Sequence, residues 1–180
     1  MKVEDLFKKR RSLRAFSDKP IASEDLKSIL EAGRLAPSAA NRQPWRFLAI
    51  TKEKGREVLR SAYDRKWFAT APCYLVIWVD HTQSWHRASD QKDHADIDAA
   101  IAAMQMCLQA TVLDIASCMV CAFDTELLKK AFSAPESCEP VMVLALGYPL
   151  HEDAFDDTVK VRKAFDEVTF FETFESAIEE

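Results

Sequence analysis

A continuous apolar run, Cys-Tyr-Leu-Val-Ile-Trp-Val at residues 73–79, constrains the fold of this chain more than any other feature. A strand with one solvated face alternates apolar and polar residues, whereas a strand covered on both faces is apolar throughout. A second run of this kind lies within residues 139–146, Glu-Pro-Val-Met-Val-Leu-Ala-Leu. Both runs therefore predict strands in the interior of a sheet, with other elements packed on each face of that sheet.

Helices account for much of the remaining chain. They are predicted in five segments: 3–9, from Ser23 as N-cap to Leu35, 54–63, 93–113 and 124–132. Residues 47–51 and 168–171 are predicted strands, and 118–123 is a short apolar segment. Because helices and strands mix without a regular βαβ alternation, the predicted class is α+β around a small sheet.

The longest predicted helix, residues 93–113, has more than one apolar stripe. Large apolar residues recur along it at three- and four-residue steps: Ile97, Ile101, Met104, Leu108 and Val112. Four alanines between positions 99 and 103 add small surfaces beside that stripe. This pattern is typical of a central helix that also packs against a second subunit.

Composition excludes several classes of protein. A chain of 180 residues with 48% apolar residues predicts a single domain over residues 1–180. No apolar run is long enough to span a membrane, and the charged N-terminus lacks a signal core. Five cysteines without a framework spacing agree with a cytoplasmic location. A net charge of -5 argues against general nucleic-acid binding, and no glycine-rich Rossmann or P-loop motif is present.

Basic residues concentrate near the N-terminus. Five of the seven residues from Lys8 to Arg14 are Lys or Arg. Such a cluster can be a solvated helix end, where cations interact favourably with the helix dipole, or it can be an anion site. The cluster alone favours the helix end, but Lys160 and Arg162 near the other end of the chain supply further cations and favour the anion site.

Residues 36–47 combine small residues, Asn and Gln, and a Pro-Trp corner before an apolar strand. Small residues let a flat ligand lie close to the main chain, and Asn and Gln offer donors and acceptors. Pro37 and Pro44 prevent a continuous helix. Taken alone, the stretch could be a ligand site or only a helix-to-strand connection.

Four motifs occur in this order: R-R-S-x-R-x-F at 10–16, P-S-x-x-N-x-Q-P-W-x-F at 37–47, G-Y-P at 147–149 and K-x-R at 160–162. Together they resemble the flavin-dependent nitroreductase family, over about Arg10 to Glu172. The resemblance implies a nitroreductase-like fold, with a small, mostly antiparallel central sheet flanked by helices. It also implies an intertwined homodimer with C-terminal strand exchange, in which residues 168–180 extend onto the partner subunit.

The resemblance implies a site for flavin mononucleotide (FMN) at the dimer interface. Arg10 and Ser12 would hold the phosphate or ribityl chain, with Lys160 and Arg162 closing over the phosphate. Arg14 would approach the N1/O2 edge of the ring, and Arg11 belongs to the same motif. Pro37, Ser38, Ala39 and Asn41 would reach the ring from the partner. Backbone amides at Cys121 and Ala122 would lie near N5, where the family commonly has glycine.

The implied activity is hydride transfer from NADH or NADPH to a nitroaromatic, a quinone or a related conjugated acceptor, by a ping-pong mechanism. Because flavin N5 carries the reaction, no catalytic side chain and no metal are expected. Two alternatives stay open: a flavin-binding or regulatory protein with little turnover, and another reaction on this fold, such as dehalogenation or flavin breakdown. The polar segment 81–92 is a predicted substrate-side loop or lid that would decide between reactions.

Cys118-Met119-Val120-Cys121 forms a C-x-x-C sequence, which can be a redox dithiol or half of a zinc site. No second C-x-x-C or H-x-x-x-H accompanies it, and the four histidines have no metal-ligand spacing. The favoured interpretation is that both cysteines are small buried apolar residues.

Overall fold

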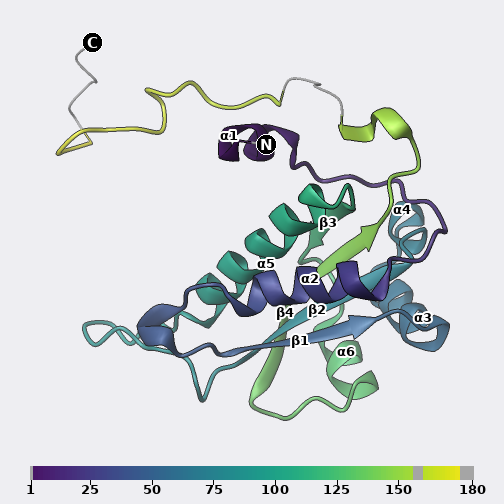
Figure 1. Ribbon diagram of the computed structural model, residues 1–180. Coiled ribbons are helices and arrows are strands. Elements are labelled where there is room, and N and C mark those ends of the chain that lie inside the picture. Colours follow the sequence, from purple (N-terminus) through teal and green to yellow (C-terminus); the bar gives the residue numbers. More distant parts are fainter. Residues whose placement is uncertain (1, 156–159, 175–180) are drawn as a thin grey trace.

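The computed structural model describes residues 2–155 and 160–174, without the side chains of 152 and 153. A four-stranded sheet forms its centre (Figure 1), in the order β1-β2-β4-β3 and with every neighbouring pair antiparallel. The strands are β1 (Trp45–Ile50), β2 (Cys73–Asp80), β3 (Ala116–Val120) and β4 (Cys138–Gly147). The two apolar runs are thus the two inner strands, and the predicted α+β fold with a mostly antiparallel sheet is confirmed.

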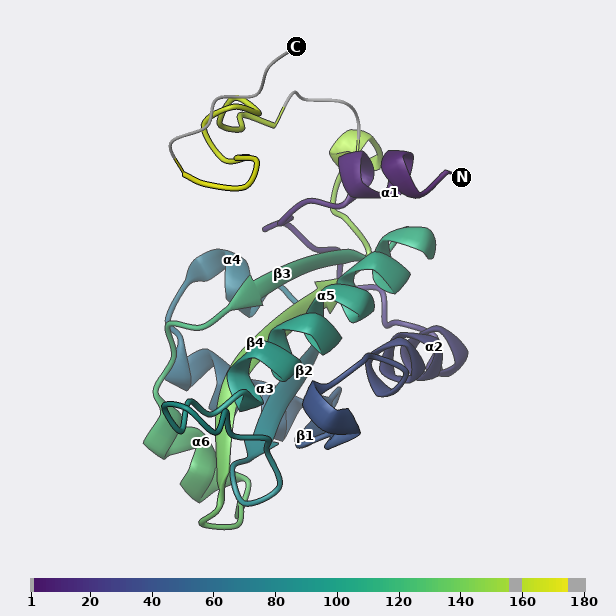
Figure 2. The same ribbon diagram turned by 90° about the vertical axis from the view of Figure 1, so that its left-hand side faces the viewer.

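Helices cover both faces of the sheet, as Figure 2 shows. One face packs against α2 (Ser23–Arg34) and α5 (Ala95–Val112), and the other packs against α3 (Glu53–Ala62), α4 (Lys66–Ala69) and α6 (Thr125–Ala131). The helix α1 (Val3–Lys9) lies beyond the end of the sheet, and the short helices η1 (Ala39–Asn41) and η2 (Glu152–Phe155) complete the described elements. None of the helices in the described ranges combines the length and apolarity that crossing a membrane requires.

Strand β2 supplies both halves of the core, because its side chains alternate between the two faces. Leu75, Ile77 and Val79 face the α2 and α5 layer, whereas Val76 and Trp78 face the opposite layer. Each large apolar side chain buried in this way contributes roughly 1.5–3 kcal/mol. The pairing of β2 with β4 shifts register beside Pro140, a residue that has no N–H to donate to the ladder.

Several element boundaries differ from those predicted. Ser23 is the first helical residue of α2 and Ala22 occupies the N-cap, so the predicted cap was wrong. Asp124 does cap α6, since its Oδ1 accepts the Leu127 N–H at 2.9 Å. The strand β1 begins two residues earlier than predicted, and β3 overlaps the apolar segment at 118–123 only over residues 118–120. The four-residue helix α4 was not predicted.

The predicted strand at 168–171 is absent from the described residues. The Val168 N–H donates to the Phe165 carbonyl at 3.2 Å, so this part of the tail forms a turn. A strand needs a neighbour for its backbone groups, and the tail lies away from the sheet in both ribbon views (Figures 1 and 2). The proposed exchange onto a partner concerns residues 168–180, of which 175–180 lie outside the described residues.

Candidate functional site

The basic segment after α1 runs alongside the edge strand β3. Ser12 pairs with Ser117 in a parallel bridge, and the Leu13 N–H donates to the Ser117 carbonyl at 3.0 Å. Side chains of an extended segment alternate between its two sides. Arg10, Ser12 and Arg14 therefore share one side, while Leu13 packs into the core on the other. The hydrophobic anchor at Leu13 thus fixes the direction in which the polar residues of the motif point.

The thiol of Cys118 shows how closely these residues gather. Burial raises the pKa of Cys118, and Arg14, Ser12 and Arg10 all lie near enough to oppose that rise. Burial also raises the pKa of Cys107 to about 11, against the influence of Ser117 and Arg10. The even-numbered residues Arg10, Ser12 and Arg14 thus lie around Cys118 of β3.

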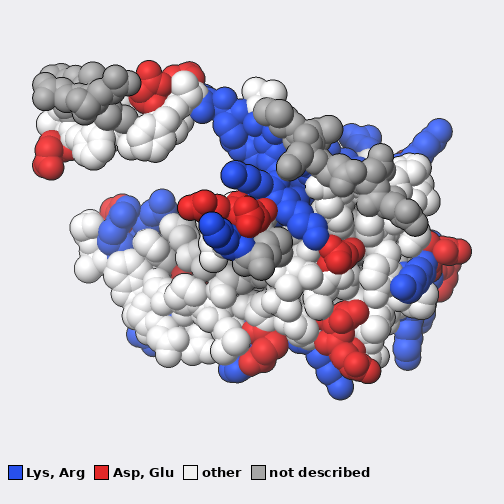
Figure 3. All heavy atoms as spheres, turned by 45° about the horizontal axis from the view of Figure 1, so that its top comes forward, with Lys and Arg blue, Asp and Glu red and all other residues white. Residues whose placement is uncertain are grey.

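Lys160 brings the far end of the chain to the same place. Its Nζ donates to the Phe7 carbonyl at 3.0 Å and also to the Arg10 carbonyl. Figure 3 shows Lys and Arg side chains gathered on this face of the molecule. Arg162 is exposed two residues further along, and its guanidinium donates to the Val161 carbonyl. The ammonium group of Lys160 is therefore brought to the backbone of Arg10, although 150 residues separate the two in the sequence.

Arg14 has a partner that the sequence did not indicate. Its guanidinium lies 5.7 Å from the centre of the Trp67 ring, in cation–π geometry. Trp67 belongs to α4, the short helix that was not predicted. This contact with α4 fixes where the charge of Arg14 lies.

The loop before β1 forms a compact, strained structure. Ala40, Asn41 and Gln43 all have positive φ, at 47°, 53° and 51°. For residues other than glycine this conformation costs on the order of 1–3 kcal/mol each, and it persists only where surrounding contacts impose it. One such contact closes the loop, since the Gln43 N–H donates to Ser38 Oγ at 2.9 Å.

A second contact attaches this loop to α5. The Ala39 N–H donates to Asp98 Oδ1 at 2.9 Å. Asp98 was missed in the sequence, where it reads as one of two acidic residues in the first turn of a helix. A buried carboxylate in such a position signals a specific partner, but that partner lies 59 residues away.

Cys121 and Ala122 follow β3 on the side of the sheet near the start of α5. Burial raises the pKa of the Cys121 thiol, and the nearby charge of Asp96 raises it further. Neither residue has a positive φ, so the lack of glycine imposes no backbone strain there. Cys118 is buried, as predicted. Cys121 is exposed because β3 ends at Val120, so the predicted burial of Cys121 was wrong.

The predicted site residues form two groups within one chain. Arg10, Ser12 and Arg14 lie near Cys118, and Arg10 also lies near Cys107 of α5, whereas the loop at 38–41 attaches at Asp98. Nine residues of α5 separate these attachment points, which is roughly 14 Å along the helix axis. The two groups are therefore separate within one chain.

The loop at 81–92 contains neither helix nor strand, as predicted. His81 links it to the fold, with Nδ1 2.6 Å from Asp93 Oδ2 and Nε2 3.2 Å from Glu139 Oε2. His86 Nε2 lies 3.6 Å from the same Asp93 oxygen. Within the described ranges, no group of three or more His, Cys, Asp or Glu side chains could hold a metal ion.

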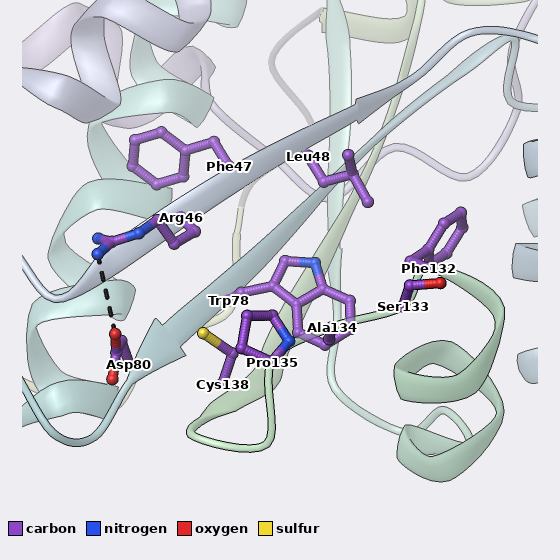
Figure 4. Close-up of a pocket in the computed structure, with 10 residues that line it drawn as sticks. All are labelled: Arg46, Phe47, Leu48, Trp78, Asp80, Phe132, Ser133, Ala134, Pro135 and Cys138. Atoms are coloured by element: carbon purple, nitrogen blue, oxygen red, sulfur yellow. Dashed lines mark ion pairs between the residues drawn. The ribbon is translucent and has the colours of Figure 1, made fainter.

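A pocket of about 430 Å³ opens elsewhere, between β1, β2 and the segment after α6 (Figure 4). Trp78, Phe132 and Pro135 form its apolar walls, and the ion pair between Arg46 and Asp80 lies at one end. None of the predicted flavin-binding residues lines it.

Comparisons with known proteins agree with the motifs. The model of the nitroreductase family matches residues 7–66 and 55–148. A protein of Archaeoglobus fulgidus, provisionally named an NADH dehydrogenase/NAD(P)H nitroreductase, is 32% identical over 81% of this chain and 84% of its own. A nitroreductase family protein of Clostridium difficile 630 has 33% identity and a TM-score of 0.87, with 96% of this chain and 99% of that chain covered. A structure titled an oxidoreductase containing FMN has the same fold at 24% identity, with a TM-score of 0.80 over 97% of this chain and 93% of that chain.

Proposed function

The chain belongs to the nitroreductase family, and from this membership we propose that it is an FMN-dependent oxidoreductase. It takes hydride from NADH or NADPH and reduces a nitroaromatic, a quinone or a related conjugated acceptor, with the two substrates using the site in turn. Similar proteins named as NAD(P)H nitroreductases support the donor, and a structural neighbour that contains FMN supports the cofactor.

One observation carries this proposal: cations from both ends of the chain converge beside β3. Arg10 and Lys160 with the hydroxyl of Ser12 form a donor set that suits a phosphomonoester dianion, and Arg14 lies beside Arg10 and Ser12. Lys160 donates to main-chain carbonyls at the end of α1. These hydrogen bonds hold its ammonium group beside the basic segment, where it would also attract an anion. The residues present therefore fit FMN.

Each group of residues has a distinct role in the proposed site. Bound FMN would supply the hydride-transfer chemistry, which needs little from protein side chains. Arg10, Ser12 and Lys160 would hold the phosphate, with Arg162 closing over it. Arg14, held by Trp67, places a positive charge that stabilises negative charge on a ligand beside it. We assign no acid or base to a side chain.

The proposed assembly is a homodimer, with FMN between loop 38–41 of one subunit and the basic segment of the other. The helix α5 exposes Ile97, Met104 and Val112, and Met104 is 42% exposed. The tail exposes three aromatic residues as well, Phe170, Phe171 and Phe174. A second copy would cover these apolar surfaces. Sedimentation equilibrium is expected to give a dimer, and a monomer that bound FMN equally well would contradict this assembly.

An anaerobic absorbance titration tests the proposed function. The purified protein, loaded with FMN, is expected to show a flavin spectrum that NADH or NADPH bleaches and that a nitroaromatic or quinone restores. Failure to bind FMN would refute the proposal. A bound flavin that neither nucleotide bleaches would favour the alternative of a flavin-binding protein with little turnover.

A further inference from the structure

We propose that Asp98 is a positioning residue, which holds the strained loop at 38–43 in the shape that contacts the flavin. This inference rests on the proposed function, because it concerns how the protein prepares that site. The Ala39 N–H donates to Asp98 Oδ1 at 2.9 Å, and Ala39 is one of the predicted ring contacts. Asp98 acts through this loop and not on the reacting atoms.

The internal contacts of the loop set its shape but do not attach it to the fold. Gln43 donates its backbone N–H to Ser38 Oγ, and its side-chain amide donates to the carbonyl and Oδ1 of Asn41. All of these partners belong to the loop itself. They could move together as a unit, so the loop needs an outside contact to fix its place.

That outside contact comes from one face of α5. Ala36 and Trp45, at the two ends of the loop, pack against Ala102. Asp98 precedes Ala102 by four residues and therefore lies on the same face of the helix, one turn away. Apolar packing holds the two ends of the loop. The hydrogen bond to Asp98 holds Ala39, which directly precedes the strained residues.

The burial of Asp98 indicates that this bond has a role beyond ordinary core stability. Asp98 is only 2% exposed, and its Oδ2 has no hydrogen-bond partner among the residues that the structure describes. A buried carboxylate oxygen without a donor is unfavourable for folding. Costly local features of this kind, together with left-handed backbone at nearby residues, are found mainly where function requires a fixed geometry.

The first test compares Asp98→Ala with Asp98→Asn. The amide oxygen of asparagine can still accept the Ala39 N–H, whereas alanine cannot. We expect Asp98→Ala to raise the Kd for FMN roughly ten-fold or more, to shift the visible flavin spectrum and to speed amide exchange at residues 38–43 in the flavin-free protein. Asp98→Asn should stay within about three-fold of the unmodified protein.

A matched control removes a carboxylate from the same helix turn. Asp96 is exposed and forms no hydrogen bond or ion pair with the loop among the residues that the structure describes, so Asp96→Ala controls for net charge and for the helix dipole. If Asp98→Ala folds and keeps the Kd for FMN, the flavin spectrum and the exchange rates of the unmodified protein, the proposal is wrong. If Asp98→Asn is as impaired as Asp98→Ala, the hydrogen bond is not what matters, and the proposal fails equally.

Ala39→Pro removes the other half of the same bond and covers the case in which Asp98→Ala does not fold. Ala39 is the first residue of η1, a position that accepts proline. Ser38, the residue before it, is extended with φ -138° and ψ 158°, as a residue that precedes proline should be. Ala39→Pro should weaken FMN binding like Asp98→Ala. The Kd of the double variant for FMN should be within about three-fold of the Kd of the weaker-binding single variant, because both changes remove the same hydrogen bond. Fully multiplicative effects would overturn the proposal.

These outcomes are separable from failure of the proposed function. If the unmodified protein binds no FMN, the function is wrong, whatever the variants do. If it binds FMN and the Asp98 variants bind equally well, only the positioning role is wrong. Amide exchange in the flavin-free protein reports on the loop in either case.

Discussion

Backbone strain marks the loop before β1 at the level of single residues. The described residues include seven non-glycine positions with positive φ, and three of them, Ala40, Asn41 and Gln43, fall within four residues. The sequence favoured this conformation only at Asn41, since Asn tolerates it and Ala does not. The motif could therefore predict that the stretch matters, but not that Asp98 holds it, because the partner lies in a distant element.

His81 predicts a pH dependence in the loop at 81–92. Its hydrogen bond with Asp93 raises its pKa, assisted by Glu139 and opposed by burial. Burial would raise the pKa of Asp93, but the Ala95 N–H and His81 outweigh it and lower that pKa to about 2. Protonated His81 stabilises the loop at 81–92. This stabilisation is complete below the ordinary histidine pKa of about 6.5 and is lost as pH rises through the raised pKa of His81.

Amide exchange of residues 81–92, corrected for intrinsic rates, measures this effect. Protection should be complete below about pH 6.5 and fall as the pH rises above that value in the unmodified protein. His81→Gln keeps a polar side chain but cannot carry the charge, so its protection should vary little with pH over the same range. An identical pH profile in both proteins would show that the charge of His81 does not hold the loop.

At the level of elements, the sequence predicted best where one local signal decided the structure. The inner strands β2 and β4 are apolar apart from Asp80 and Glu139 near their ends, and helix α5 is long and strongly apolar, so their local pattern predicts them. The helix α4 has four residues, too few for any periodicity. The tail at 168–171 carries strand-forming residues, but its conformation depends on a neighbour that the sequence does not specify.

Gly147, at the end of β4, couples the sheet to the N-terminal segment. A Cβ there would lie 2.6 Å from Pro72 Cδ and 3.2 Å from Phe16 Cβ, and the proline ring cannot turn aside. Gly147→Ala is therefore expected to lower the free energy of unfolding by about 1–3 kcal/mol. It should also weaken FMN binding, because Phe16, the last residue of the basic motif, pairs with Pro149, two residues beyond Gly147.

Urea denaturation measures the free energy of unfolding of Gly147→Ala, with Gly33→Ala as the comparison. At Gly33 the nearest atom is the terminal methyl of Met106, which belongs to a flexible side chain. Alanine is also about 1 kcal/mol more favourable than glycine in a helix, so the loss of stability should be smaller there. Equal losses in the two variants would contradict the tight packing inferred at Gly147.

At the level of the whole molecule, the two ends of the chain build one charged surface. Lys160 contacts the backbone at Phe7 and Arg10, and the basic segment lies on the edge strand β3. The motifs predicted which residues belong together, but only the fold shows that they meet. The other half of the proposed site, the loop at 38–41, attaches to a different part of α5, through the Ala39 N–H and Asp98.

The affinity of the protein for FMN relative to riboflavin, which lacks the phosphate, tests the central claim most directly. Two or more charge-assisted hydrogen bonds to a phosphate predict a Kd for FMN that is roughly 100-fold lower than that for riboflavin. Arg10→Ala with Lys160→Ala should reduce this ratio to below about ten-fold, whereas Lys8→Ala, an exposed cation on α1, should leave it unchanged. Equal affinities of the unmodified protein for FMN and riboflavin would contradict the claim that these cations bind one phosphate.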